Sequence, residues 1–126
     1  MLPYDLTFEE RPGYLYAHIS AREIDRDTAL DYLKKVADRV TDSKFERLVL
    51  ERDIPKMLVS ADLFFTTKDF LEWMGNTRVA FLNRHEPIHE EMEFAILIGT
   101  NRGANYRLFN DIAAAEEWLL AGQAAS

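Results

Sequence analysis

The chain has 126 residues, no cysteine and a formal net charge of −7, with 48% hydrophobic and 29% charged residues. This composition is that of a globular protein with a real core. Its acidic balance disfavours nucleic acid as a partner, and the lack of cysteine excludes disulfides and thiolate chemistry. We find neither a signal peptide nor an apolar run long enough to span a membrane. We therefore expect one cytoplasmic domain, residues 1–126.

The first third of the chain predicts a hairpin followed by a helix. Residues 4–10 alternate apolar and polar side chains, as a half-buried strand does. A Pro-Gly turn signal leads into a second strand at 14–21, whose odd-numbered side chains share one face. Residues 25–43 place an apolar stripe at helical spacing, and an aspartate of the opening DRD can cap this helix.

The middle of the chain predicts a buried strand and a second helix. Residues 47–54 form the strand, which a proline ends. A helix over 60–74 follows, with Ser60 as its N-cap and a glycine as its stop. The alternative is a shorter helix that begins at Thr66 or Thr67.

The rest of the chain alternates between strands and helices. Residues 77–83 and 105–110 predict strands, while 87–103 and 111–122 predict helices. The order is therefore β-β-α-β-α-β-α-β-α. Strands separated by helices are typically parallel neighbours. We predict an α/β fold with a mixed, mostly parallel five-stranded sheet and an N-terminal antiparallel hairpin.

The segment 83–99, NRHEPIHEEMEFAILIG, holds two of the three histidines. Its HEPIH letters match the zinc-protease pattern HExxH, but Pro87 breaks the continuous helix that this pattern requires. We expect His85 in a loop, His89 in the first turn of the helix, and the glutamates as favourable charges near its N-terminus. The alternative is a metal or acid/base site built from His85, His89 and Glu93, beyond the C-terminal end of a strand, where α/β sheets bind ligands.

Two segments, MLVSADLFF and FAILIG, carry more large apolar side chains than one inner helix face can use. A helix that is apolar on nearly every side is fully buried or faces a partner. The first interpretation is a large core with loops packed over it. The alternatives are a homodimer surface and a groove for a small apolar ligand. The residues of such a surface or groove would be Phe64, Phe65, Trp73, Phe94, Leu97 and Ile98.

The strings YRLFNDIAAAEEWLL and RVAFLN resemble segments of the SpoIIAA-like family, which has the fold of the STAS domain of anti-sigma-factor antagonists. The resemblance covers nearly the whole chain and rests on packing residues such as Phe109 and Trp118. It implies a binding module whose switch is a phosphorylatable Ser or Thr at the start of the second helix. Ser60 is the matching position, although Val59 precedes it where an aspartate is usual. SpoIIAA-like proteins are also similar to lipid carriers of the CRAL-TRIO type, which implies an apolar groove near the four aromatic residues named above.

Our leading hypothesis is a non-catalytic regulatory protein-interaction module, a homodimer without a cofactor. The second hypothesis is a carrier or sensor of a small apolar, lipid-like ligand. The third is a metal-dependent hydrolase or lyase that uses His85, His89 and Glu93.

Overall fold

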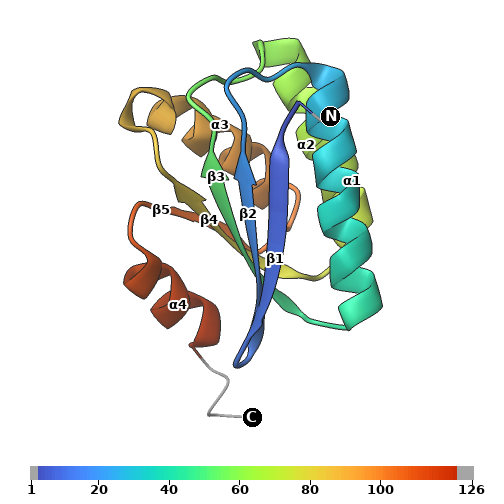
Figure 1. Ribbon diagram of the computed structural model, residues 1–126, viewed down its shortest axis with the longest axis vertical. Coiled ribbons are helices and arrows are strands. Elements are labelled where there is room, and N and C mark those ends of the chain that lie inside the picture. The colour runs from blue at the N-terminus through green and yellow to red at the C-terminus, as the bar shows by residue number, and fades with distance from the viewer. Residues whose placement is uncertain (1–2, 122–126) are drawn as a thin grey trace.

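The computed structural model describes residues 3–121 and contains a five-stranded sheet in the order β1-β2-β3-β4-β5 (Figure 1). β1 and β2 form an antiparallel hairpin, and each following strand is parallel to its predecessor. This confirms the predicted mixed, mostly parallel sheet. The strands are β1 (Asp5–Arg11), β2 (Tyr14–Ser20), β3 (Arg47–Asp53), β4 (Arg78–Asn83) and β5 (Tyr106–Phe109).

Three helices cover one face of this sheet and one helix lies on the other (Figure 1). The parallel strands are added in one direction, so right-handed crossovers place every connecting helix on the same face. The fourth helix follows the last strand and is free to pack on the opposite face. The helices are α1 (Arg26–Ser43), α2 (Ser60–Met74), α3 (His89–Thr100), which follows the 3-10 turn η1 (Glu86–Ile88), and α4 (Ile112–Leu120).

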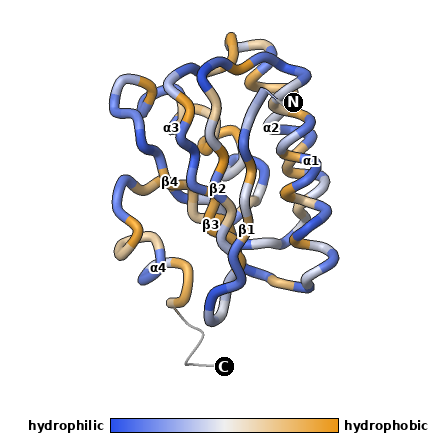
Figure 2. The backbone as a smooth tube through the Cα atoms, viewed as in Figure 1, coloured by the Kyte–Doolittle hydropathy of each residue, from blue (hydrophilic) through white to orange (hydrophobic). Residues whose placement is uncertain are grey.

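The two faces of the sheet bury two separate apolar cores. The larger core lies under α1 and α2 and contains the fully buried Leu15, Leu48 and Val79 from three strands. The smaller core lies under α4 and joins Tyr14, Val49 and Ala80 of the sheet to Ala115 and Leu119 of the helix. Figure 2 shows apolar residues along the sides of α1 and α4 that approach the sheet. The predicted alternation of β2 is confirmed, because its odd-numbered side chains enter the larger core.

The ends of the helices differ from the sequence predictions in two places. The Asp25 side chain caps α1 by accepting a hydrogen bond from the backbone N–H of Thr28 at 2.7 Å, as expected. α2 has the predicted bounds, so the alternative prediction of a shorter helix beginning at Thr66 or Thr67 is wrong. The N-cap of α2 is Val59 and not the predicted Ser60. α3 begins at His89, since Pro87 lies in the preceding 3-10 turn, and it ends three residues earlier than predicted.

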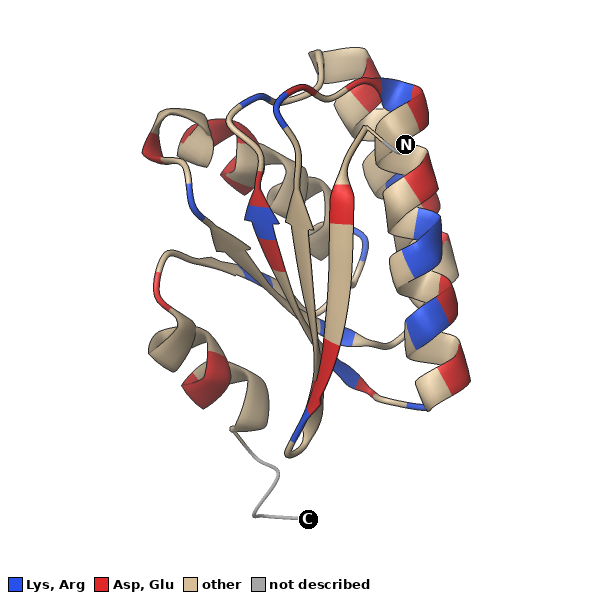
Figure 3. Ribbon diagram, in the orientation of Figure 1, with Lys and Arg blue, Asp and Glu red and all other residues tan. Residues whose placement is uncertain are grey.

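The short helix α4 leaves part of its side of the sheet uncovered. It packs on β3, β4 and β5 beside the smaller core, toward the lower end of the sheet in Figure 1. Above it, the C-terminal ends of β2, β3 and β4 carry polar side chains, and Figure 3 shows charged residues on this part of β3. Within residues 3–121, no helix combines the length and the apolar character needed to cross a bilayer.

Candidate functional site

A buried carboxylate lies at the centre of a polar network on the uncovered part of the sheet. Glu51 of β3 is only 6% exposed, although it is charged. Its carboxylate accepts a hydrogen bond from the hydroxyl of Tyr16 on β2 and a second one, of 2.9 Å, from the guanidinium of Arg84 after β4. Tyr16 and Glu51 point to the same face from neighbouring strands, and Arg84 reaches them from just beyond the end of β4. A buried charge requires such partners, because its removal from water is otherwise costly.

A second carboxylate extends this network toward the end of the sheet. Asp53 Oδ1 lies 2.7 Å from Nε2 of His85. His18 of β2 lies between the two carboxylates, with its Nε2 3.7 Å from Glu51 and 3.9 Å from Asp53. These contacts are ion pairs only when the imidazole is protonated.

The loop that holds His85 is fixed by a buried amide. The side chain of Asn83 donates to the backbone carbonyl of His85 at 2.8 Å and accepts from its backbone N–H at 3.0 Å. His89 begins α3 and pairs with Glu93, one turn later, at 3.5 Å. The imidazole of His85 therefore contacts Asp53, whereas the imidazole of His89 contacts Glu93. Within residues 3–121, no group of three or more His, Asp or Glu residues is arranged to hold a metal ion.

An open hollow of about 560 Å³ adjoins the network, between the sheet, the loop before α3 and the start of α4. Arg11 stacks over the ring of Tyr16, with its guanidinium carbon 3.9 Å from the ring centroid. Burial raises the pKa of the Tyr16 hydroxyl above its ordinary value, and the bond to Glu51 raises it further. Tyr16 therefore stays a neutral hydrogen-bond donor at physiological pH.

The second candidate site is the start of α2, on the helix-covered side of the sheet. Val59 is 69% exposed and Phe65 is 49% exposed, and Ser60, the first residue of the helix, is exposed beside them. The first turn of α2 has no side-chain cap, so its backbone N–H groups are available to other acceptors. Phe65 packs edge to face on Phe64 at 5.4 Å between ring centroids. Val59, Ser60 and Phe65 are therefore three exposed residues in the first two turns of α2, and we call them the α2 patch.

Hydrogen bonds from Arg52 hold the loop that leads to the α2 patch. The buried guanidinium of Arg52 donates to the backbone carbonyl of Ile54 at 3.0 Å and also to that of Lys56. Arg52 belongs to β3 and points away from the polar network, since neighbouring residues of a strand face opposite sides. One strand therefore supports both candidate sites.

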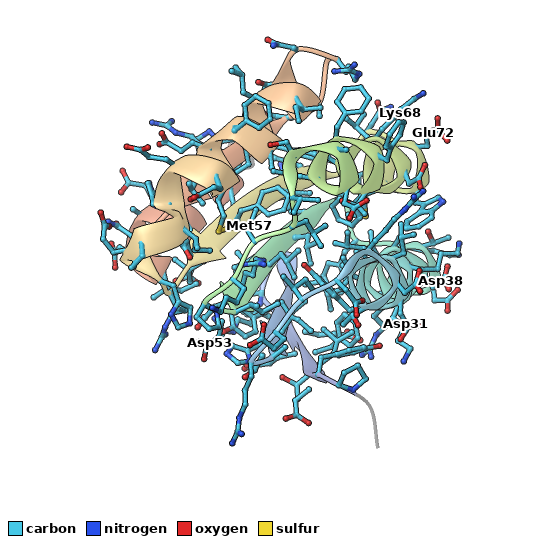
Figure 4. All side chains as sticks on the ribbon, turned by 90° about the horizontal axis from the view of Figure 1, so that it is seen from above. Asp31, Asp38, Asp53, Met57, Lys68 and Glu72 are labelled. Carbon is cyan, nitrogen blue, oxygen red and sulfur yellow. The ribbon has the colours of Figure 1, made fainter. Side chains whose placement is uncertain are left out.

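A cavity of about 80 Å³ lies between the sheet and α1, α2 and α3, below this loop. It is almost entirely apolar. Its lining includes Met57, Phe70, Met92 and Tyr106. Figure 4 shows Met57 between α2 and α3, whereas Asp53 lies away from these helices. Tyr106 is also notable because its hydroxyl is buried without a hydrogen-bond partner.

The six apolar residues predicted to form one surface or groove lie at different places. Phe94 and Leu97 are exposed on α3, at 51% and 53%, while Phe64 and Phe65 lie on α2. Trp73 packs partly against the larger core, and Ile98 is buried, so Ile98 contributes to no surface. None of the six lines the apolar cavity.

Comparison with known proteins identifies the fold. No family model and no curated protein sequence matches the chain. The structure is similar to the crystal structure of an anti-sigma factor antagonist from Mycobacterium paratuberculosis, with a TM-score of 0.66 and 17% sequence identity. The similarity covers 92% of this chain and 93% of that protein. The chain has a STAS-like fold.

Of the residues in these two sites, Ser60 and His85 were named as candidates from the sequence, whereas Tyr16, Glu51, Asp53 and Arg84 were not. Ser60 at the start of the second helix was found from the resemblance, and the structure places it on the surface. The polar network was missed, because Glu51 and Asp53 were treated only as part of a buried strand. The available signal was the ERD triplet inside that otherwise apolar strand. A charged residue in a buried position requires a partner from another element.

Proposed function

We propose that this chain is a non-catalytic regulatory module that binds a protein partner through the α2 patch. The observation that carries the proposal is the exposure of two large apolar side chains, Val59 and Phe65, at the start of the helix that also carries Ser60. Large apolar side chains that remain exposed to water are typical of protein-binding surfaces, where aromatic residues supply much of the binding energy. The anchored loop before α2 supports this assignment, since a rigid surface loses less entropy on binding.

The similarity of fold suggests the class of partner. The protein from Mycobacterium paratuberculosis is an anti-sigma factor antagonist. We therefore propose an anti-sigma factor or a related regulator as the first partner to test.

The contact is best tested by site-specific photocrosslinking. A photoreactive benzoylphenylalanine replaces Phe65 in one variant and the exposed Glu117 of α4 in a control. We expect a covalent adduct with the regulatory partner from the Phe65 position alone. Equal adducts from both positions, or none with an anti-sigma factor that binds the wild-type chain, would contradict the assignment.

We also propose that phosphorylation of Ser60 regulates this contact. A phosphate on Ser60 would lie at the uncapped N-terminus of α2, where free N–H groups and the helix dipole stabilise an anion. It would also add negative charge to the start of α2 near these exposed apolar side chains, which opposes apolar binding. The test compares Ser60→Glu with Ser60→Ala in partner binding. We expect the glutamate variant to bind more weakly, and equal binding by the two variants would remove the switch.

The apolar cavity supports a second candidate function, the binding of a small apolar ligand. Its lining includes Tyr106, whose buried hydroxyl has no hydrogen-bond partner and is free to donate to a ligand that reaches it. Native mass spectrometry of freshly purified protein tests this candidate. Extra mass that disappears when Ala95 of the lining is replaced by Leu would support it, and the bare chain mass would argue against it.

Finally, we propose that the module is a homodimer, as the surplus of apolar residues on α3 indicates. The same native spectrum reports the number of subunits. A single-chain mass at micromolar concentration would contradict this part of the proposal.

A further inference from the structure

Two arginines lie next to each other where β3 and β4 begin. Arg47 and Arg78 are directly opposite in the parallel register of these strands, which lie about 4.8 Å apart. Nε of Arg47 donates to the backbone carbonyl of Leu119 at 3.0 Å. Nη2 of Arg78 donates to the backbone carbonyl of Trp118. Both side chains therefore lie on the α4 face of the sheet, and we call Arg47 and Arg78 the arginine pair.

The arginine pair has no carboxylate partner in the described part of the chain. The arginines that form ion pairs within residues 3–121 are Arg11, Arg39 and Arg84. Burial lowers the pKa of Arg78 below its ordinary value, and the positive charge of Arg47 lowers it further. Like charges directly opposite each other destabilise a sheet. An anion bound by both guanidiniums would remove this repulsion.

Helix capping explains one of these arginines but not two. α4 ends at Leu120, so the pair contacts the last carbonyl groups of this helix. The C-terminal end of a helix carries about half of an elementary negative charge, which favours a basic side chain nearby. One guanidinium is enough to balance that partial charge. Two guanidiniums leave an excess of about one and a half positive charges.

An open hollow of about 450 Å³ adjoins the arginine pair. Its other lining residues are Phe45, Glu46, Asn76, Thr77 and Asn105. Asn76 and Asn105 are exposed, so their amide groups can donate to a ligand. Glu46 is the one acidic residue in this lining, and it forms no ion pair with either arginine. The hollow therefore presents guanidinium and amide donors to an anion.

The donors of the pair suit a phosphate group better than a carboxylate. The two oxygens of a carboxylate are satisfied by the fork of a single guanidinium. A phosphate monoester carries about two negative charges and three acceptor oxygens, which match two guanidiniums. The net charge of −7 repels nucleic acids and other extended polyanions, so the ligand is expected to be small.

We propose that the arginine pair binds the phosphate group of a small phosphate monoester. The adjoining hollow takes the rest of the ligand, whose hydroxyl groups would pair with Asn76 and Asn105. This site goes beyond the proposed partner binding, because the pair lies on the α4 face of the sheet and the α2 patch lies on the other side.

Trp118 provides the first test, since the guanidinium carbon of Arg78 lies 4.1 Å from the centroid of its ring. Trp73→Phe leaves Trp118 as the only tryptophan of the chain. In this background we expect inorganic phosphate and glycerol phosphate to change the fluorescence saturably at constant ionic strength. Acetate should change it much less, and vesicles that contain phosphatidic acid should not change it. A response to acetate as strong as that to phosphate, or a response to the vesicles alone, overturns the proposal.

Arg47→Gln removes half of the pair and leaves the contact between Arg78 and Trp118 in place. We expect it to weaken phosphate binding by more than about tenfold. Arg102→Gln is the matched control, because Arg102 also donates to a carbonyl near the end of a helix, that of Ile98 at 3.2 Å, and lies over an aromatic ring, but is outside the sheet. The control should bind phosphate as the wild type does. Equal weakening by the two changes overturns the proposal.

Nuclear magnetic resonance of the arginine side chains gives a second measurement, which does not depend on Trp118. Nε of Arg78 is buried, so its proton should exchange slowly with water, and Arg78→Lys identifies its signal by loss. We expect phosphate to shift the Nε–H signals of the arginine pair and to leave that of Arg102 in place. No saturable change in either measurement overturns the site. Loss of partner crosslinking at Phe65 with intact phosphate binding would instead remove the proposed function and leave this site standing.

Discussion

Tyr106 carries a hydroxyl that is buried without a partner in the larger core, between Phe70, Phe81 and the glycine of α3. An unsatisfied buried hydroxyl costs about 1–3 kcal/mol in proteins. We therefore expect Tyr106→Phe to stabilise the chain by about 1 kcal/mol in urea unfolding. Tyr14→Phe is the matched control with the opposite sign, because the hydroxyl of Tyr14 donates to Glu116 at 2.6 Å. A destabilised Tyr106→Phe variant would mean that the hydroxyl has a partner, such as an ordered water.

The same hydroxyl predicts a change in stability at alkaline pH. Burial raises the pKa of Tyr106 above the ordinary value of 10.0. As the pH rises above 10, the unfolded chain loses this proton before the folded chain does, so the free energy of unfolding falls. Tyr106→Phe should reduce this fall, measured by urea unfolding at several alkaline pH values. An unchanged slope would show that Tyr106 titrates alike in both states.

Glu51 is the residue on which the polar network depends. Tyr16 and Arg84 both donate hydrogen bonds to the carboxylate of Glu51. Glu51→Gln keeps the size of the side chain but replaces one of the two acceptor oxygens with an NH2 group, which cannot accept a hydrogen bond. We expect a loss of about 1–3 kcal/mol in the free energy of unfolding. Glu117→Gln on the exposed side of α4 is the control and should change stability by less than about 0.5 kcal/mol. Equal effects of the two changes would show that the network contributes nothing to stability.

At the scale of elements, the contact of α3 with β5 depends on a glycine. A Cβ atom on Gly99 would lie 2.8 Å from the ring of Tyr106, closer than packed side chains approach. In an exposed helix, Gly→Ala stabilises by about 0.5–1 kcal/mol. Here we expect Gly99→Ala to destabilise by about 1–3 kcal/mol, because the ring is held by the core and cannot yield freely.

The double variant Gly99→Ala, Tyr106→Leu isolates the cause. The smaller Leu side chain should relieve the contact, so the two changes should cost less together than the sum of their separate effects. Additive effects in thermal unfolding would show that Gly99 is needed for another reason.

At the scale of the whole molecule, partner binding and dimerisation are proposed on different surfaces. Phe65→Asp should abolish partner binding and leave the dimer, whereas Phe94→Asp should give a monomer that still binds the partner. Paired pull-down and sedimentation experiments on both variants check this separation. Loss of both properties in either variant would show that the two surfaces are coupled.

Local sequence patterns determined most of the elements of this chain, because strand alternation, helical stripes and turn residues are local properties. The bounds of α2 and the mixed sheet were predicted in this way, as was an aspartate cap on α1, although the choice between Asp25 and Asp27 was left open. Packing residues such as Phe109 and Trp118 carried the resemblance that led to the fold. The N-cap of α2 was predicted at Ser60 and is Val59, one residue earlier, because Val59 has extended backbone while Ser60 already has helical geometry.

Only the tertiary structure decided which side chains meet. Glu51, Arg84 and His85 come from β3 and from the loop after β4, and no spacing along the chain shows that they lie side by side. The same holds for the six apolar residues, which the sequence placed in one set and the structure divides between α2, α3 and the core. The physical reason is that helix periodicity shows which residues share a face, whereas the face that is left uncovered depends on the crossovers and on how far the short helix α4 reaches over the sheet.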